Sequence, residues 1–204
     1  MIAVMTDLLT LHRRTMANAA AIVDRVRPDQ LGLPTPCAAW NLGQLLAHMT
    51  GQNRGFASAA RGEDFDLAVW AETAAEEPGE AFAASAEEVV AAFAGDGATE
   101  RVWPMLVGAD QAARVPGKTA LGYHFIDYVV HAWNVAAAIG VPAEFDEDVL
   151  AAVLPLAEEV PLEGPTRNGP YAPFAPAVPS HEGEGRLERL LAILGRDPAW
   201  APED

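Results

Sequence analysis

Residues 118–139, KTALGYHFIDYVVHAWNVAAAI, form the most apolar helical stretch of this 204-residue chain, yet they hold two histidines and an aspartate. Gly140 follows the last apolar residue and Pro142 comes soon after, so the pattern predicts a helix that stops there. Burying polar groups without partners costs several kcal/mol. The three polar side chains therefore either share a partner or lie on an exposed face.

A helical wheel places these three side chains on one side of the helix. Because an α-helix turns about 100° per residue, His124, Asp127 and His131 project within a wedge of about 60°. Asp127 and His131 are four residues apart, a spacing that lets two ligands hold one cation. A third ligand has to come from another helix, and His48 is the candidate, at the edge of the apolar stripe of NLGQLLAHMTGQ, residues 41–52.

Two imidazoles and one carboxylate would leave coordination positions for water or substrate, which is typical of a reactive metal site. The spacing alone leaves another interpretation open, in which core histidines bond to backbone carbonyls and Asp127 and His131 form only an ion pair. His124 is the candidate catalytic residue: it could carry a proton, lie at the pocket mouth, or support a metal ligand from behind. His12 could reach the same cavity, whereas His181 lies in a proline-rich stretch and is expected to face solvent.

Apolar periodicity predicts further helices on either side. Steps of three and four residues from Leu8 to Val26 predict a first helix that ends near Pro28. The other expected helices cover residues 41–61, 80–93, 146–159 and 186–194. Residues 62–79 are expected to form a loop, RVWPML (101–106) could be extended, and the proline- and glycine-rich residues 161–185 are expected to wrap the surface. This pattern predicts a single all-α domain over 1–204, a four-helix bundle of about 1–140 with a helical extension of about 141–204.

Composition narrows the classes of partner. The net charge of −16 and the pI near 4.5 disfavour nucleic acids and anionic membranes. With Cys37 as the only cysteine, no intrachain disulfide can form, which fits a reducing compartment. The first residues lack the features of a signal peptide and no apolar run is long enough to span a membrane, so we expect a soluble cytoplasmic protein. No phosphate-binding glycine motif indicates a nucleotide cofactor.

Two aromatic residues and the cysteine flank the candidate ligands. Trp40 and Trp133 are interpreted as packing residues because their rings bring a large buried area. Cys37 precedes the second helix, where a helix N-terminus can lower the pKa of a thiol. A lone buried cysteine is more often inert, and we do not assign it to catalysis.

Three stretches resemble one family of proteins. LPTPCAAWNLGQLLAHMTGQN (33–53), DYVVHAWNVAAAIG (127–140) and FAPAVPSHEGEGRLERLLAILGRDPAW (174–200) are similar to segments of the DinB-like, mycothiol-dependent maleylpyruvate isomerase metal-binding domain family. The resemblance implies a DinB-like four-helix bundle that binds a divalent metal, zinc or nickel, through His48, Asp127 and His131. It also implies a low-molecular-weight thiol such as mycothiol as cosubstrate.

The sequence departs from the family at two single residues and in the tail after Gly140, which does not match the separate C-terminal domain of the isomerases. The isomerases have Glu where this chain has Asp127, and Asn134 replaces the family's Asp after HAW. The hypothesis is a metal-dependent enzyme of the thiol-transferase or isomerase kind that acts on a small molecule, and a homodimer is compatible with such bundles. The alternatives are a non-catalytic metal- or small-ligand-binding protein and a bundle without metal.

Overall fold

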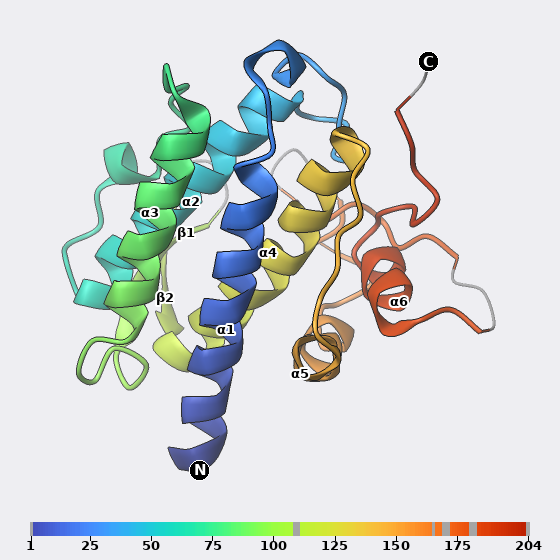
Figure 1. Ribbon diagram of the computed structural model, residues 1–204. Coiled ribbons are helices and arrows are strands. Elements are labelled where there is room, and N and C mark those ends of the chain that lie inside the picture. Colours follow the sequence, from blue (N-terminus) through green and yellow to red (C-terminus); the bar gives the residue numbers. More distant parts are fainter. Residues whose placement is uncertain (1, 108–110, 165, 169–171, 180–182, 203–204) are drawn as a thin grey trace.

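The chain folds into a predominantly helical bundle. A computed structural model describes residues 2–107, 111–164, 166–168, 172–179 and 183–202, with side chains from residue 8 onward except that of Val107. Its α-helices are α1 Ile2–Val23, α2 Leu42–Arg61, α3 Pro78–Phe93, α4 Gly117–Ala138, α5 Glu147–Glu158 and α6 Arg186–Ile193, with short 3-10 helices η1 Pro28–Gln30 and η2 Leu67–Trp70 (Figure 1). The predicted all-α class is confirmed.

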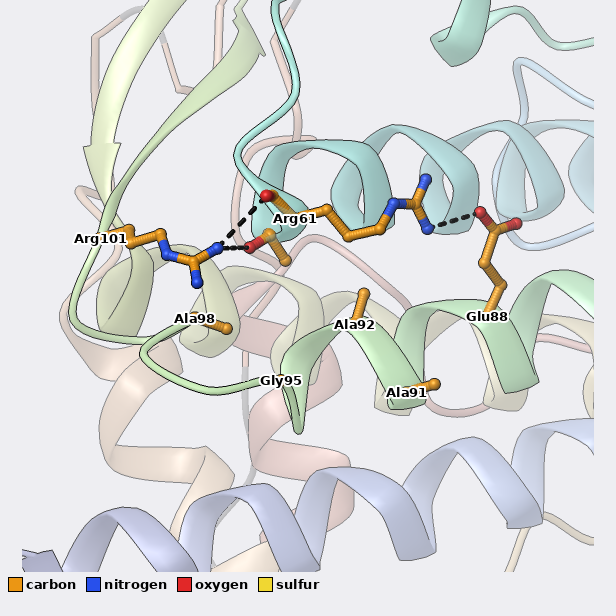
Figure 2. A pocket seen from close by; sticks show the side chains of 8 residues that line it. Arg61, Glu88, Ala91, Ala92, Gly95, Ala98 and Arg101 are labelled. Atoms are coloured by element: carbon orange, nitrogen blue, oxygen red, sulfur yellow. Dashed lines mark hydrogen bonds and ion pairs between the residues drawn. The ribbon is translucent and has the colours of Figure 1, made fainter.

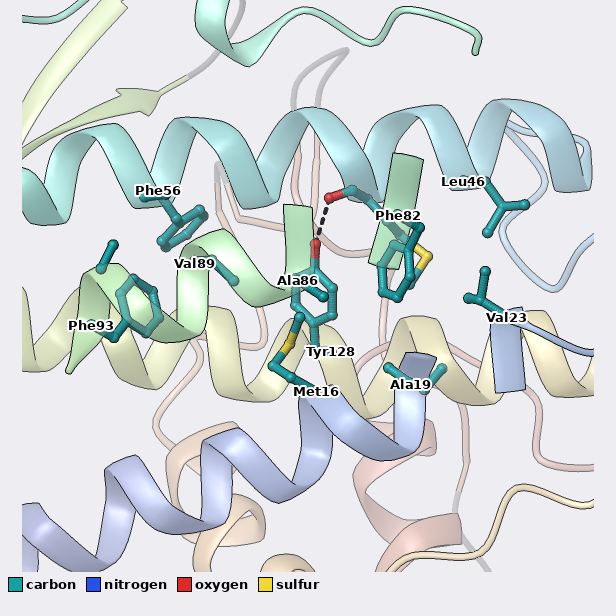
Figure 3. Packing of buried hydrophobic residues seen from close by; sticks show 14 of the residues in the cluster. Met16, Ala19, Val23, Leu46, Phe56, Phe82, Ala86, Val89, Phe93 and Tyr128 are labelled. Atoms are coloured by element: carbon teal, nitrogen blue, oxygen red, sulfur yellow. Dashed lines mark hydrogen bonds between the residues drawn. The ribbon is translucent and has the colours of Figure 1, made fainter. Parts of the chain in front are cut away.

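The first four helices enclose the main core. α2 packs along α3, and α1 contacts both α3 and α4. Figure 3 shows the interior, to which α1 contributes Met16, α2 contributes Phe56, α3 contributes Phe93 and α4 contributes Tyr128. The Tyr128 hydroxyl donates a hydrogen bond to the Met49 carbonyl, 2.5 Å away, which gives the buried phenol a partner.

Helix α4 is buried on two sides. Phe125 and Val129 point away from the main core and join a second apolar cluster with Val153 of α5 and Leu190 of α6. Figure 1 shows α5 and α6 together on one side of the bundle. Because both faces of α4 are covered, its sequence is nearly all apolar, and each polar residue on it needs a specific partner.

The ends of α2 are defined by local chemistry. The Asn41 side chain accepts a hydrogen bond from the Gln44 backbone N–H at 2.9 Å, and the Gln44 side chain accepts one from the Asn41 N–H at 3.0 Å. This reciprocal capping box fixes where the helix starts. At the other end Gly62 takes a left-handed conformation with φ of 78°, which glycine adopts without steric cost. The register of His48 follows from this start.

Two segments differ from the sequence-based expectation. α1 ends at Val23, and Val26 reaches the core from the following turn, so the first helix is shorter than predicted. The extended RVWPML stretch is confirmed as β1, Val102–Val107, but its antiparallel partner β2, Gln111–Pro116, was not predicted. β1 is anchored by buried Trp103, whose indole N–H donates to the Ala98 carbonyl at 2.7 Å. None of the described helices is long and apolar enough to cross a membrane.

Candidate metal centre

The three predicted ligands come together. His48 of α2 and Asp127 and His131 of α4 each offer a ligand atom, and these atoms lie within 4.8 Å of one another. The Asp127 Oδ1 and His131 Nε2 atoms are 3.2 Å apart, and the two imidazole centroids are 5.3 Å apart. Two atoms bonded to one zinc ion at about 2.0–2.2 Å lie at most about 4.4 Å apart, so small side-chain movements would bring the three ligand atoms onto one ion. The donor set, two imidazoles and a carboxylate, therefore fits a divalent cation.

His48 is held by two residues that the sequence analysis did not assign to the site. Its Nδ1 atom lies 2.7 Å from Glu72 Oε1, so the ring donates its Nδ1 proton to that carboxylate and keeps a lone pair at Nε2. The Trp40 indole stacks on the other side, with ring centroids 4.1 Å apart. A carboxylate that accepts the second ring N–H is a common feature of metal-ligating histidines.

The position of Glu72 depends on a tightly packed segment beside α2. The preceding 3-10 helix ends at Trp70, which is buried against Phe56 with ring centroids 5.5 Å apart. The indole lies so close to Gly55 that a Cβ atom there would be 2.1 Å from Trp70 Cδ2. Gly51 permits a similar approach, because a Cβ atom at that position would be 2.8 Å from the Ala71 carbonyl oxygen. The two glycines thus let this segment lie against α2 and bring Glu72 to His48.

The electrostatics of the site favour the protonation states that metal ligands need. Burial lowers the pKa of His131 below its ordinary value, which keeps the imidazole neutral. Burial opposes ionisation of Asp127, but the positive charge that the His131 and His48 rings carry when protonated, together with the hydrogen bond from His131, outweighs it and holds the pKa of that carboxyl at about 2. A neutral imidazole and an ionised carboxylate are the forms that bind cations.

The C-terminal extension also reaches this region. Arg196, which follows α6, is buried and places its Nη2 atom 3.6 Å from Cys37 Sγ. Burial raises the pKa of the Cys37 thiol, although the Arg196 guanidinium acts in the opposite direction. The same guanidinium contributes to the lowered pKa of His131. The raised pKa argues that Cys37 is a thiol rather than a thiolate.

His124 lies in the core with both ring nitrogens engaged. Its Nδ1 is 2.9 Å from His12 Nε2 and its Nε2 is 3.2 Å from Asn53 Oδ1, while Asn53 in turn donates to Ser85 Oγ at 2.9 Å. The ring also stacks on Tyr128, with centroids 4.1 Å apart. Burial drives the pKa of His124 well below its ordinary range and that of His12 to about 3. Both rings are therefore neutral, and a catalytic role for His124 stays a prediction. His181 lies outside the described residues.

A separate pocket of about 410 Å³ opens between the C-terminal ends of α2 and α3. Figure 2 shows its two arginines. Arg101 donates to the carbonyls of Ala60 and Arg61, both at 3.2 Å, and Arg61 donates to Glu88 at 2.8 Å. The Arg101 contacts supply the terminal carbonyls of α2 with a cationic partner. We therefore interpret the arginines of this pocket as structural, and the metal centre remains the candidate functional site.

Fold and site together define a class: a DinB-like helical bundle in which a histidine of one helix faces an acidic residue and a histidine of another. The chain belongs to the mycothiol maleylpyruvate isomerase N-terminal domain family, which matches residues 12–136. It is 34% identical over 199 residues to an uncharacterised protein of Mycobacterium tuberculosis, found in strains CDC 1551 and H37Rv. That similarity covers 93% of this chain and 98% of the relative, so it includes the C-terminal extension.

Two solved structures share the fold. They are the mycothiol-dependent maleylpyruvate isomerase and a variant of it with one histidine replaced by alanine, with TM-scores of 0.56 and 0.57. Each is 16% identical to this chain and covers 74% of it, while the chain covers 67% of each of those proteins. At this identity the likeness establishes the architecture, and it leaves the reaction of the present protein to be argued from its own residues.

Proposed function

We propose that this protein binds a divalent cation, zinc or nickel, through His48, Asp127 and His131. The observation that carries the proposal is the convergence of three ligand atoms from two helices that are far apart in the sequence. The contact between Glu72 and His48 supports it, because it leaves the Nε2 lone pair of His48 available. An ion pair between Asp127 and His131 alone would not require a histidine of α2 beside them.

We further propose that the site is catalytic and acts on a small molecule with a low-molecular-weight thiol such as mycothiol. A divalent cation with open positions lowers the pKa of a coordinated water or thiol, which supplies a nucleophile near neutral pH. In this chain three side chains would hold the ion, Glu72 would orient His48, and the Trp40 ring would shield one face of that imidazole. The name of the family supports the thiol, and the reaction class would be transfer to a thiol or isomerisation.

The first test is metal content. Protein purified without an affinity tag is analysed by mass spectrometry of its metals, alongside His48→Ala, Asp127→Asn and His131→Ala. We expect about one zinc or nickel ion per wild-type chain and a large loss in each variant, since the removal of one of three protein ligands weakens coordination. If the variants keep their metal, or if the wild type takes up none when incubated with either ion, the assigned ligands are wrong.

The second test separates an enzyme from a metal carrier. Loss of free thiol is followed while the metal-loaded protein is incubated with mycothiol and a panel of small electrophiles, with His131→Ala as the inactive control. Consumption that requires the intact ligands supports catalysis, and His124→Gln shows whether the buried histidine takes part. A loaded protein that consumes no thiol with any electrophile is a non-catalytic metal-binding protein. Light scattering tests separately whether the protein is a homodimer.

A further inference from the structure

The carboxamide of Asn134 lies next to the His131 ring and is completely buried. Its Nδ2 atom is 3.2 Å from His131 Nδ1, but among the described residues its Oδ1 atom has no hydrogen-bond partner. A buried amide oxygen without a partner costs about 1–3 kcal/mol. A rotation of the amide by half a turn would leave Nδ2 instead of Oδ1 without a partner, so burial alone does not decide between the two orientations.

The two orientations of the amide correspond to the two neutral forms of His131. In the arrangement described, the amide N–H donates to Nδ1, and the ring proton sits on Nε2, 3.2 Å from Asp127 Oδ1. A rotation of the amide by half a turn exchanges its oxygen and nitrogen with almost no change in shape. The oxygen then accepts a proton carried by Nδ1, and Nε2 presents a lone pair to the site.

Only the second form can ligate a cation through Nε2, because a protonated ring nitrogen has no lone pair to offer. Nε2 is the nitrogen that faces Asp127, whereas Nδ1 faces Asn134. We propose that Asn134 is a positioning residue that selects the metal-binding form of His131 through its amide oxygen. This inference rests on the proposed metal site.

An asparagine at this position suits both forms, because an amide can donate or accept. A carboxylate of the same size can only accept, so it favours the proton on Nδ1 before any cation arrives. A leucine can do neither and leaves the Nδ1 proton of a metal-bound His131 without a partner. The three side chains therefore predict an order of metal affinity, with Asp highest, then Asn, then Leu.

The test compares zinc binding by wild type, Asn134→Asp and Asn134→Leu, with metal-free protein in calorimetric titrations. We expect the dissociation constant to fall about 10-fold in Asn134→Asp and to rise about 10-fold in Asn134→Leu, in line with known effects of residues behind metal ligands. Without zinc, Asn134→Asp should be less stable to urea than the wild type, because it buries a further carboxylate close to Asp127 without a metal ion to offset the two negative charges. A purely packing role would instead make affinity and stability fall together.

A measurement on the unaltered protein covers the case in which Asn134→Asp does not fold. The ¹⁵N chemical shifts of His131 should show the proton on Nε2 without zinc and on Nδ1 with zinc. Zinc affinity that is equal in all three proteins, or weaker with Asp than with Leu, contradicts the inference, as does an Nδ1 without a proton in the zinc-bound protein. If the wild type binds zinc and one of these results is found, only the role of Asn134 is refuted. If the wild type binds no zinc, the proposed metal site is refuted as well.

Discussion

Gly55→Ala is the substitution with the sharpest consequence that the structure predicts away from the ligands. The new Cβ atom would lie 2.1 Å from Trp70 Cδ2 and 2.4 Å from Trp70 Cε3, inside any normal contact distance. Trp70 is 5% exposed and forms part of the main core. The indole must therefore move out of its position, because the backbone of α2 is fixed by core residues on its opposite side.

The change in the free energy of unfolding of Gly55→Ala is the sum of one stabilising contribution and of destabilising ones. Replacing glycine by alanine inside a helix is favourable by about 1 kcal/mol. Strain from an overpacked core opposes this by about 1–3 kcal/mol. If the indole leaves the core altogether, the loss of about 150–250 Å² of buried surface at about 25 cal/mol per Å² amounts to roughly 4–6 kcal/mol, an upper bound. We expect the free energy of unfolding to fall by up to about 2 kcal/mol if the indole stays in the core under strain, and by about 3–5 kcal/mol if it leaves the core.

Gly122→Ala is the matched control. Gly122 also lies inside a long helix and is buried, but a Cβ atom there would be 3.7 Å from Leu156 Cδ1, an ordinary contact. This substitution should raise the free energy of unfolding by up to about 1 kcal/mol. The assay is urea unfolding followed by circular dichroism for both variants and the wild type. Equal stabilities of the two variants would show that Gly55 is not needed to accommodate Trp70.

The same pair of variants tests the link from Trp70 to the metal centre. Glu72 comes two residues after Trp70 and bonds to His48, so a displaced indole moves the carboxylate away from the ligand. Gly55→Ala should therefore bind zinc more weakly than the wild type although residue 55 is not a ligand, and Gly122→Ala should bind it normally. Unchanged affinity in a destabilised Gly55→Ala variant would mean that Glu72 keeps its contact with His48 without Trp70.

Three further predictions address single contacts. Glu72→Gln should weaken zinc binding by about 10-fold in calorimetric titrations, because a neutral amide holds the His48 ring less firmly, and equal affinity would refute this. Titration with Ni²⁺ should quench tryptophan fluorescence through the ring stacked on His48, and Trp40→Phe should remove most of that quenching. The pKa of His12 is about 3 in the folded protein and about 6.5 in the unfolded chain. As the pH drops from about 6.5 towards 3, the unfolded chain therefore binds a proton at His12 that the folded protein does not, and the free energy of unfolding should fall. His12→Gln keeps a hydrogen-bond donor next to His124 but has no titrating group. Over this pH range the slope of its unfolding free energy should be smaller than that of the wild type by about 1.4 kcal/mol per pH unit. An identical pH profile for the two proteins would contradict the assignment.

The sequence was sufficient to predict features that depend on a single helix, namely the helices themselves and the residues that share one face. Periodicity predicted the helices, and the wheel placed Asp127 and His131 on one face. The edge of the apolar stripe of residues 41–52 indicated His48 as the third ligand, and the resemblance to the family agreed with it. Glu72 could not be identified in this way, because it lies in an irregular segment with several other acidic residues, none of which a periodic pattern favours. The contact arises from the packing of Trp70 on α2, which depends on two glycines that also have no signature of their own.

The position of His124 shows what a helical wheel leaves out. The wheel groups His124 with His131 because it records only the angle around the axis. Seven residues at a rise of about 1.5 Å each separate the two along α4 by about 10 Å, too far for both to ligate one ion. At its own level of the bundle His124 meets His12 from α1 and Asn53 from α2 instead. The polar residues of α4 thus serve two separate networks, one that faces the candidate metal ligands and one that supplies hydrogen bonds inside the core.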